Sequence, residues 1–402
     1  MYDRRSSPIP CSALAGVTAG RAALMVLLAL LSGCSTSDPV ELWTQATAAF
    51  QAHRYDQAEA AMARLAKLRE PTANDHMMRA QLALVHDDND AALSELAQVT
   101  VDSPLASQAR LQQGQIELRR HRVRLAEKYL FEALKLDPKL ARARKELIYI
   151  YGFQLRRSDL SAQFGELAKL EPLAFEQVFL WCLTRGVVWE PQEAASALAL
   201  QVDADPDDLA SRLALAETLR RLNQPGEAEK RLAPVPNDNP DARTLRAQIA
   251  LDRGDFSAAE ALLAGGPKRH IGLALLRGRI AQSRGEDAAA LAAFREAVAA
   301  EPDNRDAILG LAQTLRRVGS PEAAHYTDLS ANHERLNGVV QRASNPGSKS
   351  KPDLIKELGA ACASVGRFPE ARSWYALAIS LNPLDTEAQQ ALYKIKDDKP
   401  PG

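Results

Sequence analysis

The residue types that most often do chemistry are thinly spread along this chain. Seven histidines are scattered through 402 residues, and the sequence has no CxxC pair, HExxH motif or phosphate-binding GxxxxGK[ST] loop. It also lacks the GxSxG nucleophile turn. Two carboxylate pairs, Asp87-Asp88 and Asp207-Asp208, stand where helices are expected to begin, a position in which acidic side chains cap free backbone amides. We therefore predict helix caps at these pairs, and no catalytic residue, bound metal or cofactor.

One of the four cysteines has an informative setting. Cys34 follows Leu31-Ser32-Gly33 at the end of a ten-residue apolar run, Ala22–Leu31. This run is too short to span a bilayer comfortably, and a positive segment precedes it, with arginines at Arg4, Arg5 and Arg21. The tetrapeptide resembles the bacterial lipobox, in which the cysteine receives a diacylglycerol group.

The resemblance to the lipobox implies that residues 1–33 are a lipoprotein signal peptide and that Cys34 becomes a lipidated N-terminus. Residues 34–40 would form a short tether, and the acyl chains would hold the protein on a membrane of the bacterial envelope, facing the periplasm. Ser35 in place of aspartate favours the outer membrane over the inner one. An ordinary signal peptide, or a buried apolar segment with a chance cysteine, are the alternatives.

Two cysteines remain in the body of the chain. Cys182 and Cys362 both fall on apolar faces of expected helices, which predicts buried free thiols. Their large separation in the sequence argues against a disulfide between them.

Prolines and alanines recur with a fixed period of 34 residues. The prolines are Pro104, Pro138, Pro172, Pro206 and Pro240, and the alanines in the same frame are Ala58, Ala92, Ala126, Ala194 and Ala228. A period of this length is typical of stacked helical hairpins. Alanine, leucine and charged residues dominate the composition, which favours helix. The sequence therefore predicts an all-α fold.

The segment 105–138 shows the pattern of one unit. Two expected helices, 106–119 and 123–136, carry the small residues Gly114 and Ala126 where their axes should cross. With this pattern the chain resembles the tetratricopeptide-repeat family. The resemblance implies a right-handed α-solenoid of about ten hairpins with a C-terminal capping helix. In the eighth unit it places Gly278 against Ala290.

Departures from the repeat set the expected boundaries. Repeats one to nine occupy 41–336, a polar Gly/Ser/Pro-containing loop or hinge follows at 337–351, and the last repeat with the capping helix takes 352–396. Residues 397–402 are predicted to form a disordered tail. In the fourth unit, Ile148 and Leu160 replace the small crossing residues, so that hairpin must splay or shift.

The resemblance also indicates a binding groove lined by the first helix of each unit. The residues that we select there are cations and aromatics of the fourth to sixth units: Arg142, Lys145, Tyr149, Phe153, Phe179 and Arg220. Aromatic residues are dense over 129–189, where they either fill a poorly packed core or form a recognition patch.

These observations favour a membrane-anchored scaffold that holds another protein or peptide and is not an enzyme. Assistance to envelope assembly or export is the narrower hypothesis. A carbohydrate- or exopolysaccharide-binding or secretion scaffold is the alternative, and sugar binding would require an exposed aromatic ladder. An enzyme with an atypical site is the third and least favoured hypothesis. A net charge of −1 gives no basic face for nucleic acid.

Overall fold

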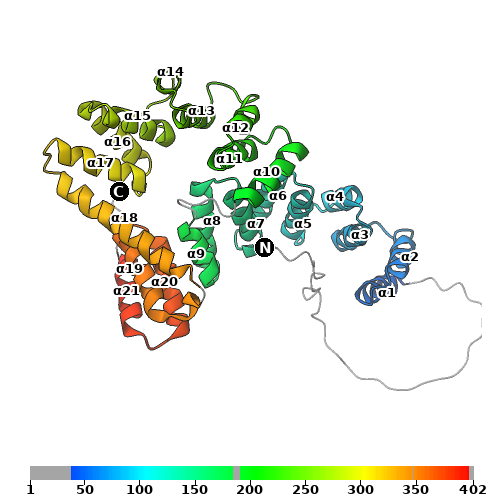
Figure 1. Ribbon diagram of the computed structural model, residues 1–402. Coiled ribbons are helices and arrows are strands. Elements are labelled where there is room, and N and C mark those ends of the chain that lie inside the picture. The colour runs from blue at the N-terminus through cyan, green and yellow to red at the C-terminus, as the bar shows by residue number, and fades with distance from the viewer. Residues whose placement is uncertain (1–37, 184–190, 346, 398–402) are drawn as a thin grey trace, which may run out of the picture. The chain divides into compact units, whose positions relative to one another are not determined.

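The structure, a computed structural model, describes residues 38–183, 191–345 and 347–397 (Figure 1). The predicted signal peptide, Cys34 and the tail from residue 398 lie outside these residues. Twenty-one α-helices and one short 3₁₀ helix, η1, make up the described part, which contains no strand. The all-α fold class is therefore confirmed.

The helices follow one another with short connections. The first half of the chain contains α1 (Pro39–Gln51), α2 (Tyr55–Leu65), α3 (Ala73–Val85), α4 (Asn89–Ala97), α5 (Ala106–Arg119), α6 (Val123–Leu136), α7 (Ala141–Phe153), α8 (Arg157–Leu170), α9 (Phe175–Leu183) and α10 (Pro191–Ala204). The second half contains α11 (Leu209–Arg221), α12 (Pro225–Leu232), α13 (Pro240–Asp252), α14 (Phe256–Ala264), α15 (Ile271–Ser283), α16 (Asp287–Ala300), α17 (Arg305–Arg317), α18 (Ala323–Ala343), η1 (Ser348–Ser350), α19 (Pro352–Ser364), α20 (Phe368–Leu381) and α21 (Thr386–Asp397).

The chain divides into two compact units, Met1–Arg69 and Glu70–Gly402. In the first unit, α1 and α2 pack as one hairpin around Ala46, Ala58 and Met62. In the second unit, hairpins such as α3–α4, α5–α6 and α15–α16 follow one another in sequence order. The final hairpin is α19–α20, and α21 packs on its second helix. The predicted cap therefore forms, and its Ala388 and Ile395 are buried.

Helix starts and turns follow the sequence signals. Asp88 and Asp208 cap α4 and α11, where their carboxylates accept hydrogen bonds from the amides of Ala91 at 2.9 Å and Ser211 at 3.1 Å. The second carboxylate of each pair is thus a cap, as predicted. Within several hairpins one turn residue has positive φ, a conformation that glycine adopts at low cost. The glycines in this state between paired helices are Gly254, Gly285, Gly319 and Gly366.

Glycines inside the helices mark close crossings. A Cβ atom added to Gly278 on α15 would lie 2.6 Å from the ring of Phe294 on α16, and one added to Gly310 on α17 would lie 2.4 Å from the same ring. Phe294 is thus held between two glycines and is almost fully buried. The sequence placed Ala290 against Gly278, whereas the closest side chain is Phe294, one helical turn further along α16.

The predicted loop over 337–351 is much shorter. Helix α18 continues to Ala343, and η1 occupies part of the remainder. Val339, Val340 and Ala343 are buried on the inner face of α18, so this stretch has an apolar stripe that its polar composition conceals. The predicted break at residue 337 is therefore wrong, and helical structure extends seven residues further.

The largest core joins two stretches that are far apart in sequence. It includes Leu147, Phe164 and Trp181 from α7–α9 together with Ile355 and Trp374 from α19–α20. Figure 1 shows α9 beside α18 and α20, and these helices pack directly on one another. A simple stack in which every repeat contacts only its sequence neighbours does not produce such a core.

Candidate functional site

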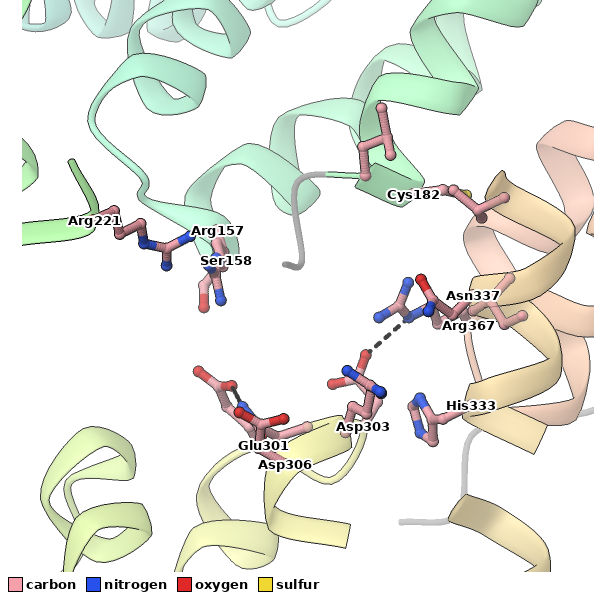
Figure 2. A pocket seen from close by; sticks show the side chains of 15 residues that line it. Arg157, Ser158, Cys182, Arg221, Glu301, Asp303, Asp306, His333, Asn337 and Arg367 are labelled. Atoms are coloured by element: carbon pink, nitrogen blue, oxygen red, sulfur yellow. Dashed lines mark hydrogen bonds and ion pairs between the residues drawn. The ribbon is translucent and has the colours of Figure 1, made fainter. Parts of the chain in front are cut away.

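A cavity of about 400 Å³ opens where α8, α9, α11, α17 and α18 converge (Figure 2). Most of the side chains around it are charged or polar. They are Arg157, Ser158, Arg221, Glu301, Asp303, Asn304, Arg305, Asp306, His333, Asn337 and Arg367, with Cys182, Leu183, Leu336 and Val340 adding an apolar edge. The cavity is therefore suited to a polar or charged group.

Two arginines form one wall of the cavity. Figure 2 shows Arg157, the first residue of α8, and Arg221, the last residue of α11, with their guanidinium groups turned toward each other. Arg221 is bound to Glu217 at 2.6 Å. The side chain of Arg157 forms no hydrogen bond or ion pair with the part of the chain that the structure describes. Among the described residues, this positive charge at the cavity thus has no direct counter-ion.

The electrostatics of this wall follow from burial and like charge. Burial, and then the positive charge of Arg221, lower the pKa of Arg157 from its ordinary value, while Glu301 acts in the opposite direction. Arginine nevertheless remains charged in proteins. A bound anion would relieve the unfavourable environment of Arg157.

Carboxylates form the facing wall. Glu301 and Asp306 lie opposite the arginines in Figure 2 and belong to the turn between α16 and α17 and to the start of α17. Asn304 caps α17 and donates its side-chain amide to Glu301 at 2.8 Å. Asp306 accepts a hydrogen bond from Arg279 at 2.6 Å. This side of the cavity can accept hydrogen bonds from an amide or an ammonium group.

The third side of the cavity ties two repeats together. Arg367, which precedes α20, approaches Asp303 in the α16–α17 turn, with Nε and Oδ2 3.5 Å apart. His333 on α18 points into the same region and is almost fully buried. The arrangement provides charged or polar binding groups on three sides of the cavity.

The six residues that the sequence selected do not gather at this cavity. Tyr149 and Phe153 form a ring pair with centroids 4.8 Å apart, and Tyr149 is 44% exposed. Lys145 pairs with Glu171 at 2.6 Å, and Arg142 is exposed.

The other two selected residues serve packing or ion pairing. Phe179 stacks on Phe175, with ring centroids 5.7 Å apart, at the edge of the large core. Arg220 is bound to Glu217 at 2.9 Å and to Asp252 at 2.7 Å. Its neighbour Arg221, which shares Glu217, is the residue that lines the cavity.

Three large rings in the described part of the stretch 129–189 belong to the core. Tyr151, Phe164 and Trp181 are at most 1% exposed. Trp181 stacks on Phe164 and donates a hydrogen bond to Ser161 at 3.0 Å. These three rings fill space between helices and do not form a surface ladder, whereas Phe131 and Tyr149 keep an exposed face.

Sequence reasoning missed the cavity itself. Arg157, Glu301 and Asp303 lie on different repeats and gave no local motif. A weak signal was available in the polar turn around Pro302, because Glu301, Asp303 and Asp306 place three acidic residues around one helix start. Their meeting with Arg157 depends on α8 and α17 coming together, which no short pattern records.

Comparison with known families identifies the class. Models of the tetratricopeptide repeat match residues 77–141, 190–249 and 275–327. These three stretches of the chain therefore carry tetratricopeptide repeats, and such repeats typically form scaffolds for protein–protein interaction. A comparison with curated proteins finds no matching relative.

Several solved structures have similar helical arrays. A tetratricopeptide repeat protein from Parabacteroides merdae shares 12% identity, with 81% of this chain and 99% of that chain covered and a TM-score of 0.27. The structure of the human IFIT1 dimer with PPP-AAAA shares 13% sequence identity, with 87% of this chain and 91% of that chain covered and a TM-score of 0.33. Yeast Tom70 shares 11% sequence identity, with 90% of this chain and 89% of that chain covered and a TM-score of 0.31. These likenesses concern the helical fold alone.

Proposed function

We propose that this protein is a lipid-anchored, periplasm-facing repeat scaffold of the bacterial envelope that holds a segment of a partner protein. Its cavity binds the acidic part of that segment. The observation that carries the proposal is Arg157, a half-buried cation at the cavity wall that has no direct partner in the described chain.

The chemistry of the cavity defines the kind of segment. A carboxylate placed between Arg157 and Arg221 would receive charge-assisted hydrogen bonds and lower the repulsion between the two cations. Glu301 on the facing wall would accept a backbone amide or a basic side chain of the same segment. A partner peptide with a carboxylate next to a donor therefore fits better than an apolar helix.

The anchor part of the proposal rests on the sequence. Residues 31–34 resemble a lipobox, and lipid on Cys34 would fix the repeats at a membrane surface. A role in envelope assembly or export fits a scaffold held at this place. In the described residues, no helix is long and apolar enough to cross a membrane.

Site-specific photo-crosslinking tests the cavity. A photoreactive amino acid at Ser158, an exposed position on the cavity wall, should capture a protein partner in intact envelopes. The same label at the exposed Tyr393 on α21 is the positional control. Arg157→Glu should abolish capture from Ser158, and Lys394→Glu, an equal charge change on exposed α21, should not.

Two results would contradict the binding site. One is capture of equal yield from both labelled positions, which would mean non-specific contact. The other is capture from Ser158 that Arg157→Glu leaves unchanged, because the cation would then have no part in binding.

A separate experiment tests the anchor. Labelled palmitate should enter the wild type and not Cys34→Ser, and the variant should leave the membrane fraction. A Cys34→Ser protein that stays with the membranes, with no label in the wild type, would contradict lipidation and leave the cavity untouched.

A further inference from the structure

Cys182 and Cys362 are 180 residues apart in sequence, yet their Sγ atoms lie 3.7 Å apart. Cys182 is near the end of α9, and Cys362 is on the last turns of α19. Both thiols are free and buried. The sequence correctly predicts buried free thiols, but its argument that distance separates them is wrong, because α9 packs against the C-terminal repeat.

The surroundings hold the two thiols in contact. The indole Nε1 of Trp374 donates a hydrogen bond to Cys182 Sγ at 3.3 Å, and Trp374 has no exposed surface. Contact with Cys182, and then burial, raise the pKa of Cys362. Cys182 also lines the cavity, so of the two thiols it is the one within reach of a reagent.

We propose that Cys182 and Cys362 are a disulfide site that fastens α9 to α19. A disulfide has its sulfur atoms about 2.05 Å apart, so the two must approach by roughly 1.6 Å, a movement within reach of side-chain rotation. Because the Sγ atoms already touch inside one core, the repeats need no rearrangement to form the bond.

The oxidant is a disulfide, either that of a dithiol–disulfide oxidoreductase or oxidised glutathione. The Cys182 thiolate attacks it, forms a mixed disulfide and releases one thiol. Cys362 then loses its proton, attacks the Cys182 sulfur and releases the second thiol. The two cysteines give up two electrons and two protons, which the oxidant takes up as two thiols.

The bond would close a loop that runs from the fifth repeat to the last. Such a loop contains α10 to α18 and most of the cavity wall, so the bond would fix the cavity edge at Cys182. Formation of the disulfide in the cell rests on the proposed periplasmic location, since oxidising compartments are where disulfides persist. Formation of the disulfide in the purified protein does not depend on that location.

Peptide mapping of the purified full-length protein tests the site directly. The native protein is incubated with oxidised glutathione and a catalytic amount of a dithiol–disulfide oxidoreductase, alkylated and digested with trypsin. We expect peptide 170–185 joined to peptide 357–367, lighter by two hydrogen atoms than their sum, and separate after reduction. Cys182→Ala and Cys362→Ala are the matched controls, and neither should give the joined species.

Two results would overturn the proposal: recovery of the two peptides separately as alkylated thiols, or as stable glutathione adducts. The same mapping on acid-quenched cells then separates the two claims. A bond that forms in the purified protein but is absent in cells contradicts the periplasmic location and leaves the site in place.

Discussion

The stretch α15–α17 and the stretch α7–α9 are built from the same kind of hairpin but pack in different ways. In α15–α17, Phe294 lies between Gly278 and Gly310, and all three come from consecutive helices. In α7–α9, Phe164 and Trp181 share their core with Trp374 and Ile355 of the C-terminal repeat. One region is stabilised by its sequence neighbours and the other by helices almost 200 residues away.

The difference follows from side-chain size. Glycine on one helix lets a large ring of the next helix come close, so a regular hairpin buries its apolar surface against its sequence neighbours. The fourth unit carries Ile148 and Leu160 where small residues are expected, and the helices of α7–α9 leave large apolar faces. The C-terminal repeat covers these faces, and the cavity lies beside this long-range contact.

The largest expected effect comes from removing the ring at the centre of the long-range core. Trp374→Ala should lower the free energy of unfolding by about 3–5 kcal/mol, because Trp374 is fully buried and the site cannot collapse easily. Urea denaturation followed by circular dichroism measures this. A loss below about 1 kcal/mol would mean that α20 does not pack on α9.

Close packing in the regular region gives the next effect. Gly278→Ala should cost about 1–3 kcal/mol, since the new methyl group would meet the Phe294 ring, which Gly310 prevents from retreating. Gly338→Ala on the exposed face of α18 meets nothing within 4 Å and should stabilise the protein by about 0.5–1 kcal/mol. Thermal melts of both variants test the sign; equal shifts would contradict the close crossing.

Two adjacent arginines in the irregular region should behave differently. Arg156 donates to Glu127 and Asp159, both at 2.8 Å, and its guanidinium lies 4.3 Å from the Tyr151 ring centre. Arg156→Gln should therefore cost about 1–2 kcal/mol. Arg157→Gln removes a cation that has no direct partner among the described residues, and it should change stability by less than about 0.5 kcal/mol. Matched urea titrations compare the two, and a larger loss at Arg157 would show a structural role for it.

The smallest effect concerns pH. Arg124 donates to Asp205 at 2.9 Å, and this bond holds the pKa of Asp205 below its ordinary value. A lowered carboxyl pKa stabilises the folded chain at neutral pH, and this contribution is lost as the pH falls through the folded-state pKa. Arg124→Gln should be slightly less stable than the wild type at pH 7, and the difference should shrink below about pH 4. A difference that grows on acidification would contradict the pairing.

The sequence predicts the regular part of the molecule well, because each hairpin is encoded locally. The period of 34 residues and the caps at Asp88 and Asp208 are short-range signals. The core shared by Trp181 and Trp374, and the cavity between Arg157 and Glu301, arise only when distant repeats meet. The helix that continues past Asn337 was missed for a related reason: its buried stripe is narrow and lies among polar residues.

Hydrogen exchange at α9 tests most directly whether the C-terminal repeat and the α7–α9 region share one core. Exchange of α9 amides is compared by mass spectrometry in the wild type, in Trp374→Ala and in Phe294→Ala, whose lost ring lies in the regular region. If the core is shared, exchange in α9 should be faster in Trp374→Ala and unchanged in Phe294→Ala. Unchanged α9 protection in Trp374→Ala, with exchange rising only in α19–α21, would contradict a shared core.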